Sequence, residues 1–299
     1  MTAELAADEM LAVLRAACLS VGIDADGAEL LRLSENAIYK LPGGVVVRIS
    51  RPGQQVAARR EVEVARWLET SDVHAVQVFP SVEQPVEVDG RSVTFWKELP
   101  PHHYGTPAQV AAALRQLHRL APPMNFELGE VTPFVRLKER IDGASTLTED
   151  DRRWMHEHLK ELRQRWTYLP KGLPWCVIHG DAWVGNVVST DDGQVILLDL
   201  ERTSIGSPEW DLVHTAIKWT SFGWISAEQY AEFCEVYGHD VTTWQGFELL
   251  RDIREFRMAT MAAQSAAINS DDREQAIRRL ECIRGDEGLR PWSGWRALS

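Results

Sequence analysis

The sequence predicts an α+β protein of two lobes, in which a lobe built on an antiparallel sheet precedes a larger, mainly helical lobe. Three observations predict this fold class. The chain has 299 residues, more than one hydrophobic core usually accommodates. Its first part alternates short apolar runs with one helical segment, whereas the rest is dominated by helical periodicity. The change between the two patterns falls near residue 98.

We therefore expect a first lobe at residues 1–97, a hinge at residues 98–107 and a second lobe at residues 108–299. The hinge segment contains three prolines and one glycine. Such a composition is typical of linkers between compact regions.

The elements of the first lobe follow from its apolar pattern and its turn residues. An amphipathic helix is expected at residues 1–22, and strands are expected at 30–34, 37–41 and 45–50. A helix at 56–68 follows. Two more strands flank Asp89 and Gly90, a pair that favours a two-residue hairpin turn.

The second lobe is predicted to contain helices on both sides of one strand-and-loop region. Helices are expected at residues 108–120, 133–141 and 147–168, and short strands within 176–200. Further helices are expected at 210–220, 227–237, 244–267 and 271–283.

Composition excludes several classes of protein. The net charge is -12, from 32 basic and 44 acidic residues, which argues against nucleic acid or an anionic membrane as partner. The four cysteines are scattered and show no zinc-ligand spacing, so we expect reduced thiols. No stretch reads as a signal peptide or a membrane span, and we expect a cytoplasmic protein.

The stretch CVIHGDAWVGNVVSTDDGQVILLDL, residues 176–200, places Asp181, Asn186 and Asp199 beside short apolar runs. Its pattern is HxDxxxxN, followed by an aspartate thirteen residues after the asparagine. These groups suit phosphoryl transfer: Asp181 can accept a proton from a substrate hydroxyl, while Asn186 and Asp199 offer oxygen ligands to Mg²⁺. The alternative is a turn capped by Asp and Asn.

This stretch resembles the catalytic and metal-binding loops of the aminoglycoside phosphotransferase and choline kinase-like family. These are small-molecule kinases that share the protein-kinase fold. The matching positions are His179, Gly180, Asp181, Asn186, Asp199 and Glu201, followed by Gly206, Pro208, Trp210, Asp211 and Leu212. The resemblance implies a bilobal protein-kinase-like fold, Mg²⁺ and ATP or GTP as cofactors, and Asp181 as the base.

A kinase also needs a cation in its first lobe that pairs with a helix carboxylate. Arg48 stands in VVVR where the kinase pattern VAIK has its lysine, and Lys40 is the substitute candidate. The carboxylate is Glu61 or Glu63. Because a helix advances about 100° per residue, these two side chains point about 200° apart and only one can face the nucleotide.

The other nucleotide contacts are predicted from their place in the chain. Ser34 and Asn36 lie where the family has its glycine-rich phosphate loop, although this segment contains no glycine and an ordinary turn is the alternative. By resemblance, the edge of the purine would bind backbone groups around Glu98 and Leu99.

Three residues are predicted to support the site. His179 would orient the loop through ring hydrogen bonds to the backbone or to Asp211. Glu201 would contact a second metal ion or form a salt bridge with a nearby basic residue. Asp211 opens a predicted helix, where N-capping is the first interpretation.

The acceptor region is predicted from aromatic and acidic side chains after residue 205. They are Trp210, Trp219, Trp224 and Trp244 with Glu209, Glu228, Glu232, Glu235, Asp271 and Asp272. Such groups suit an organic cation, whereas core tryptophans and solvated acids are the alternative.

The leading hypothesis is a kinase that phosphorylates a hydroxyl of a small cationic molecule, first an aminoglycoside or another basic antibiotic. A metabolic kinase for choline, homoserine or a sugar-like compound is the alternative within the same fold. A nucleotide-binding pseudokinase module is the alternative from another class. A protein-substrate kinase is disfavoured, because HGD replaces HRD and no APE sequence follows the metal loop.

Overall fold

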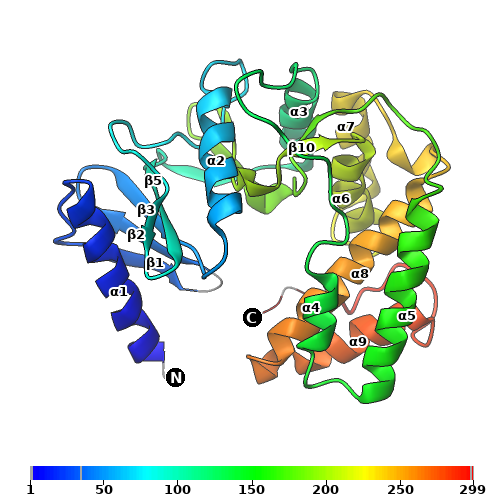
Figure 1. Ribbon diagram of the computed structural model, residues 1–299. Coiled ribbons are helices and arrows are strands. Elements are labelled where there is room, and N and C mark those ends of the chain that lie inside the picture. Colours follow the sequence, from blue (N-terminus) through cyan, green and yellow to red (C-terminus); the bar gives the residue numbers. More distant parts are fainter. Residues whose placement is uncertain (1–2, 34–35, 297, 299) are drawn as a thin grey trace. The chain divides into compact units, whose positions relative to one another are not determined.

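The computed structural model describes residues 3–33, 36–296 and 298 (Figure 1). The chain packs as two compact units. The first contains Met1–Gln109, Ala121–Leu128 and Val184–Thr203, and the second contains Val110–Leu120, Gly129–Trp183 and Ser204–Ser299. The units therefore interleave along the chain, whereas the predicted lobes are continuous segments. The assignment of a nucleotide-binding and a catalytic lobe stays a prediction.

The first unit contains a five-stranded antiparallel sheet. Its strands are β1 (Glu29–Leu33), β2 (Ala37–Leu41), β3 (Val45–Ile49), β4 (Val86–Val88) and β5 (Arg91–Lys97), in the order β1-β2-β3-β5-β4. Every second residue of β2 and β3 is buried, as the period of a strand requires. Tyr39, Val47 and Phe95 belong to a core that Leu14 and Cys18 of α1 (Ala3–Ser20) share.

The predicted connections within this sheet are confirmed. Asp89 and Gly90 both have positive φ, 49° and 73°, as a two-residue hairpin turn of this kind requires. The helix predicted at 56–68 is α2 (Gln55–Leu68), whose buried residues include Glu61, Val62 and Leu68.

The predicted hinge contains a strand that the sequence pattern did not indicate. This strand, β6 (His102–Tyr104), pairs antiparallel with β8 (Val187–Thr190), and β8 pairs with β9 (Val195–Leu197). The amide of Gly105 also donates to the carbonyl of Val187 at 2.8 Å. Segment 98–107 is therefore more than a linker, because it adds a strand to a sheet formed mostly by residues far along the chain.

The second unit is mainly helical. The helices are α3 (Pro107–Leu117, whose last residues belong to this unit), α4 (Leu137–Asp142), α5 (Glu149–Trp166), α6 (Glu209–Thr220), α7 (Ala227–Tyr237), α8 (Phe247–Ala266) and α9 (Arg273–Arg284). The long helix α8 contacts α4, α5, α6 and α9 (Figure 1). One short pair of strands, β7 (Cys176–Ile178) and β10 (Ser204–Gly206), completes the unit.

Most helix ends lie close to the predicted ones, and the exceptions have local causes. Helix α5 begins after Thr148, which forms a capping box with Asp151. The helix predicted at 133–141 begins only at Leu137, because Arg136 has a left-handed φ of 63°. None of the helices within the described residues is both long and apolar enough to cross a membrane.

Candidate active site

The HGD segment follows β7 in the second unit. Ile178, the last residue of β7, pairs with Ser204 of β10, and Gly180 then turns the chain with a φ of 84°. A residue with a side chain rarely adopts this conformation. The strand end and the glycine therefore set the direction in which Asp181 leaves the sheet.

The carboxylate of Asp211 holds this segment in place. The amide of His179 donates to Oδ2 at 2.7 Å and the amide of Gly180 donates to Oδ1 at 2.8 Å. The ring Nε2 of His118 lies 3.1 Å from Oδ2. Burial by itself raises the pKa of Asp211, but the bond to His118 and the charges of His179 and Arg254 outweigh it and hold that pKa below its ordinary value.

The predicted N-cap role of Asp211 is wrong. Asp211 lies inside the first turn of α6, the N-cap position is Pro208, and no side chain caps this end. The sequence around Asp211 suggested a cap because acidic residues are common in the first turn of a helix. The acid is instead fully buried, and a buried carboxylate needs donors, which the HGD backbone provides.

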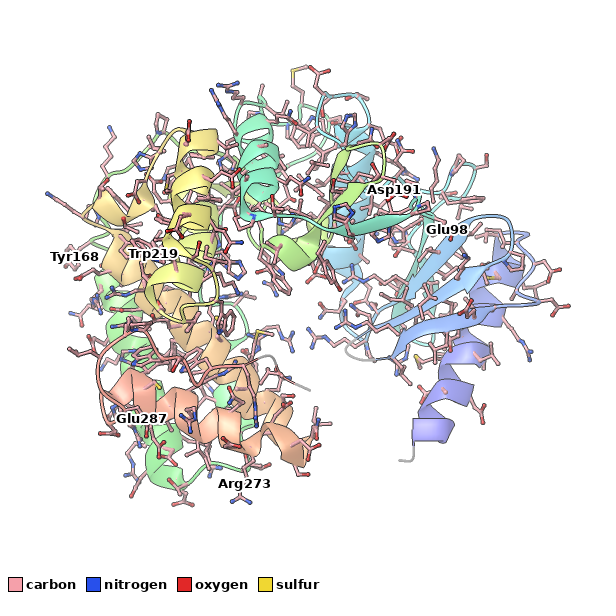
Figure 2. The ribbon with its side chains drawn as sticks, turned by 180° about the vertical axis from the view of Figure 1, so that it is seen from behind. Glu98, Tyr168, Asp191, Trp219, Arg273 and Glu287 are labelled. Carbon is pink, nitrogen blue, oxygen red and sulfur yellow. The ribbon has the colours of Figure 1, made fainter. Side chains whose placement is uncertain are left out.

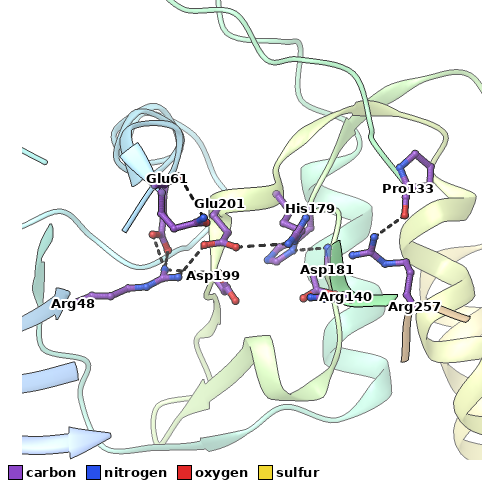
Figure 3. Close-up of polar contacts among 12 residues, drawn as sticks. Arg48, Glu61, Pro133, Arg140, His179, Asp181, Asp199, Glu201 and Arg257 are labelled. Carbon is purple, nitrogen blue, oxygen red and sulfur yellow. Dashed lines mark hydrogen bonds and ion pairs between the residues drawn. The ribbon is translucent and has the colours of Figure 1, made fainter. Parts of the chain in front are cut away.

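The ring of His179 is buried and orients Asp181, two residues later. Its Nδ1 accepts a hydrogen bond from the amide of Asp181 at 3.3 Å (Figure 3). The ring was predicted to bond either to the backbone or to Asp211, and this contact is one to the backbone. The contact between His179 and Asp211 is made by the backbone amide of His179.

Arg254 of α8 is a member of the site that sequence reasoning missed. Its Nη2 donates to the carbonyl of Gly180 at 3.1 Å and to that of Trp210 at 2.8 Å. Its guanidinium lies 4.0 Å from the centre of the Trp210 ring, whose Nε1 also donates to Gly180. No local motif marks Arg254, because α8 meets this loop only through the tertiary fold.

The carboxylate of Asp181 is about one third exposed, and a guanidinium and an imidazole ring lie close to one of its oxygens. Oδ1 lies 3.5 Å from Nη1 of Arg254 and 3.7 Å from Nδ1 of His214, with 33% of the Asp181 side chain exposed. Burial lowers the pKa of His214 well below its ordinary value, and the charges of Arg254 and Lys218 act in the same direction. His214 is therefore neutral near pH 7.

In the first unit, the predicted pair of Arg48 and Glu61 is confirmed. Nη1 of Arg48 contacts both carboxylate oxygens of Glu61, at 2.8 and 2.7 Å (Figure 3). Glu61 is 4% exposed whereas Glu63 is partly exposed, which decides between the two. The substitute candidate Lys40 instead forms an ion pair with Glu98, at 2.5 Å.

Arg48 also reaches the loop after β9. Its Nη2 donates to Oε2 of Glu201 at 2.9 Å, and its Nη1 lies 3.8 Å from Oδ1 of Asp199. The salt bridge predicted as one alternative for Glu201 is therefore present. The amide of Leu200 also donates to Glu61.

This cluster shifts the acidity of its members. Burial raises the pKa of Glu61 to about 7, Arg48 opposes the shift, and the carboxylates of Asp199 and Glu201 add to it. Burial disfavours the charge of Arg48, but the carboxylates of Glu61, Asp199 and Glu201 outweigh it and raise the pKa of Arg48.

Asn186 and Asp199 lie at the same end of the β8–β9 hairpin. Val187 pairs with Leu197, and the amide of Leu198 donates to the carbonyl of Asn186 at 2.9 Å. Within the described ranges no group of three or more His, Cys, Asp or Glu side chains could hold a metal ion. Mg²⁺ needs fewer protein ligands than that, because it is usually bound by one or two carboxylates together with water and substrate phosphates. One amide and one carboxylate fit that pattern.

The predicted phosphate and purine contacts can be described only in part. Ser34 lies outside the described residues. Asn36 lines a small cavity of about 10 Å³ together with Arg48, Glu61 and Glu201. The amide of Glu98 donates to the carbonyl of Gly44 at 2.8 Å, so that amide is used within the protein, while Leu99 is partly buried.

Several residues of the predicted acceptor region have structural roles. Trp210 is buried at 2% exposure, and Trp219, which Figure 2 labels, stacks on Tyr230. Glu209 is buried and accepts from the amide of Leu173 at 2.6 Å, and buried Asp272 accepts from Ser265. The other acids in that set, Glu228, Glu232, Glu235 and Asp271, are exposed.

Comparison with known proteins identifies the family. The model of the phosphotransferase enzyme family matches residues 32–250. No curated protein matches the chain.

Solved structures show the same fold at low identity. The amicoumacin kinase hAmiN, in complex with AMP-PNP, Ca²⁺ and Ami, has a TM-score of 0.67 at 16% identity and covers 99% of this chain and 98% of its own. The choline kinase LicA from Streptococcus pneumoniae has a TM-score of 0.63 at 15% identity, covering 92% and 99%. The aminoglycoside phosphotransferase APH(3'')-Id from Streptomyces rimosus has a TM-score of 0.58 at 23% identity. The similarity covers 85% of this chain and 98% of that protein.

These similarities confirm the predicted α+β class and the protein-kinase-like fold. The family match spans well over half of the chain. The chain therefore belongs to the phosphotransferase enzyme family.

Proposed function

We propose that the protein transfers the γ-phosphoryl group of ATP or GTP to a hydroxyl of a small molecule, in a Mg²⁺-dependent reaction. The observation that carries the proposal is the fastening of the HGD segment. Asp211 binds two consecutive amides of this segment, and Asp181 follows with a partly exposed carboxylate. Rigid placement of a base beside a bound hydroxyl is the main contribution that a protein makes to phosphoryl transfer.

Asp181 is the proposed general base. As the acceptor oxygen bonds to the γ-phosphorus and the bond to the β,γ-bridging oxygen breaks, the hydroxyl proton passes to the Asp181 carboxylate. Arg254 lies 3.5 Å from Oδ1 and would keep the carboxylate oriented. Neutral His214 at 3.7 Å does not add a competing charge.

Asn186 and Asp199 are the proposed Mg²⁺ ligands. When bound, the ion would neutralise charge on the nucleotide phosphates. Arg48, held by Glu61, is the proposed cation for the same phosphates. Ser34, Asn36 and backbone groups at Glu98 and Leu99 remain the proposed further contacts of the nucleotide.

An adenine nucleotide is the favoured donor. The similar structures include complexes with AMP-PNP, with AMP and with ADP. These are properties of those proteins, and they support ATP over GTP for this chain.

The acceptor was expected from sequence to be a cation, first an aminoglycoside or another basic antibiotic. The similar structures include kinases of both antibiotic and metabolic type, so a choline, homoserine or sugar-like acceptor is the second candidate. The acidic residues give limited support for a cation, because Glu209 and Asp272 are buried in structural hydrogen bonds.

The test is a Mg²⁺-dependent transfer assay with labelled ATP and GTP. The acceptor panel contains aminoglycosides, other basic antibiotics, amino alcohols, sugars and hydroxy acids. We expect transfer to one class of acceptor, and only with Mg²⁺. Nucleotide binding without transfer to any acceptor would favour the pseudokinase module instead.

A further inference from the structure

The most unusual group near Asp181 is a lysine held between two indole rings. Nζ of Lys218, on α6, lies 4.6 Å from the centre of the Trp224 ring and 5.3 Å from that of the Trp183 ring. These distances are those of cation–π contacts. We call Lys218, Trp183 and Trp224 the lysine clamp.

Hydrogen bonds fix one wall of the lysine clamp, Trp224. The amide of Trp224 donates to the carbonyl of Lys218 at 2.7 Å, across a turn in which Gly223 has a φ of 63°. The indole Nε1 of Trp224 donates to the carbonyl of Trp295 at 3.0 Å. Trp183 lies two residues after Asp181, so the base and one wall belong to the same loop.

The ammonium of Lys218 has N–H donors that no acceptor atom in the described part of the chain uses. Its printed neighbours within the described part of the chain are the two indole faces, and no acceptor atom bonds to Nζ there. A lysine ammonium carries three donors, and because Lys218 is only partly buried these donors can reach a bound group. Burial lowers the pKa of Lys218 to about 8; the carboxylate of Asp181 opposes the shift and Arg254 and Arg279 add to it.

The groups beside the base favour an anion over a cation. Arg254 lies 3.5 Å from Asp181, Lys218 interacts electrostatically with the same carboxylate, and His214 is neutral. The two aromatic faces that could bind an ammonium group already hold the Lys218 ammonium. An incoming cation would have to displace the Lys218 ammonium from these faces, whereas an anionic oxygen could bind the donors of that ammonium.

We propose that Lys218 binds an anionic group of the acceptor, a carboxylate or a phosphate, while Asp181 receives the proton of a hydroxyl on the same molecule. The proposal rests on the proposed kinase function and names the acceptor as a hydroxyl compound that carries an anionic group. It replaces the cationic acceptor that the sequence suggested. Lys218 acts as a specificity-determining residue, and the indoles hold its ammonium in place.

The first test measures how fast an amine-acylating reagent labels Lys218 in the wild-type protein. The added probes are sodium glycolate, sodium phosphate and choline chloride, each against sodium chloride at equal ionic strength. Exposed Lys160 of α5 is the internal control in the same digest. We expect glycolate, phosphate or both to slow the labelling of Lys218 several-fold and to leave Lys160 unchanged. Choline is expected to have no effect.

Two results overturn the proposal in this experiment. One is labelling of Lys218 that neither anion slows, and the other is equal protection by choline. AMP-PNP is tested alone as well. Protection by AMP-PNP without an acceptor would assign Lys218 to the nucleotide and would also overturn the proposal.

The second test uses Lys218→Met, which keeps most of the side-chain volume, with Lys218→Arg as the conservative variant and Lys160→Met as the matched control. The substrates are the acceptor found by the panel and its charge-neutral derivative. We expect Lys218→Met to raise the KM for the anionic acceptor about 10- to 100-fold, the range for loss of one hydrogen bond to a charged group. The KM for the neutral derivative and the kcat for both should change little, and Lys218→Arg should recover most of the loss.

The outcomes separate this proposal from the proposed function. Transfer only to cationic acceptors, or an equal effect of Lys218→Met on both substrates, overturns the role of Lys218 and leaves the kinase function standing. A protein that binds no nucleotide and transfers no phosphate overturns the kinase function, whatever the labelling shows.

Discussion

At the scale of single residues, Arg48 departs most from the pattern of the family, and the structure gives a reason for it. A guanidinium has two amino ends, and here Nη1 binds Glu61 while Nη2 binds Glu201. The ammonium of a lysine is one compact point on a flexible stem. The arginine therefore joins helix α2 to the loop that carries Asp199.

We predict that Arg48→Lys destabilises the protein because Glu201 loses its contact with Arg48 at 2.9 Å and keeps the longer one with Arg202 at 4.0 Å. The side chain of Glu201 is 23% exposed, and a charged group left without its close partner there should lower the free energy of unfolding by about 1–3 kcal/mol. Adding Glu201→Gln should recover part of this loss, with a coupling energy of about 0.5–3 kcal/mol. Urea unfolding of the single and double variants measures both quantities.

Exposed Arg59, also on α2, provides the control as Arg59→Lys, which should leave stability unchanged. Strict additivity of Arg48→Lys and Glu201→Gln would contradict the bridging role of Arg48.

Asp211 is the second residue whose role can be tested alone. An asparagine offers one oxygen, so Asp211→Asn cannot accept from the amides of both His179 and Gly180 in the same geometry. We expect the free energy of unfolding to fall by about 3 kcal/mol and kcat to fall at least about 10²-fold, since the base is no longer held in position. Exposed Asp150, changed to Asn, is the matched control. Normal kcat in Asp211→Asn would show that the anchor is dispensable.

The lowered pKa of Asp211 also predicts a pH dependence. Because its folded pKa lies below the unfolded value of about 3.9, Asp211 contributes stability above that pH and loses it as the pH falls through the folded pKa. The difference in stability between wild type and Asp211→Asn should therefore be constant from pH 5 to 7 and shrink in stronger acid. Unfolding curves across this range measure the difference, and one that grows in acid would contradict the assignment.

At the scale of elements, α6 serves the site with one face. Asp211, His214 and Lys218 are three and four residues apart, which places them along one side of the helix. From them the site gains an anchor for the loop, a neutral neighbour of the base and the ammonium of the lysine clamp. The sequence marked only the first of the three, because the others are significant through what packs against them.

The lysine clamp predicts how acceptor binding depends on pH. With the pKa of Lys218 at about 8, the ammonium is charged at pH 7 and becomes neutral as the pH rises past 8. The KM for an anionic acceptor should then rise above pH 8, while the KM for its neutral derivative stays level. Asp181 favours the charged form, and Arg254 and Arg279 disfavour it. A flat profile for the anionic acceptor from pH 7 to 9, or one that Lys218→Arg leaves unchanged, would contradict the role of Lys218.

Elements with local determinants were predictable, and elements with distant partners were not. The hairpin at Asp89 and Gly90 depends on the two residues themselves. Strand β6 exists because β8, more than eighty residues later, pairs with it. A run with three prolines and one glycine gave no sign of that partner. Arg254 is a similar case, since α8 reaches the HGD segment through tertiary packing alone.

At the scale of the whole molecule, the motif that the sequence shows as one run is divided between two compact units. Asp181 belongs to the second unit, and Asn186 and Asp199 belong to the first. The sequence predicted the fold class from its length and apolar pattern, and it predicted the family from a short run of specific residues. The cationic acceptor stays a prediction, because counting acids and tryptophans does not show which of them the fold uses in its own core.

For the whole molecule we predict that nucleotide and Mg²⁺ stabilise the fold together. A ligand at 100 times its Kd adds about 2.7 kcal/mol to the free energy of unfolding. Mg²⁺-ATP should therefore raise the Tm of the wild type by several degrees. Asp199→Asn should lose most of that increase, and Asp191→Asn, on the β8–β9 turn, is the control. An unchanged increase in Asp199→Asn would exclude Asp199 as a ligand of the ion.

The central claim is that Asp181 is the base of a small-molecule kinase. The most direct test is the rate of Mg²⁺-ATP-dependent transfer by Asp181→Asn, measured with the acceptor that the wild type uses, together with nucleotide affinity from titration. The account predicts that kcat falls by about 10²- to 10⁴-fold, the usual contribution of a general base. The nucleotide Kd should stay near the wild-type value. A variant that transfers phosphate at the wild-type rate would contradict the account.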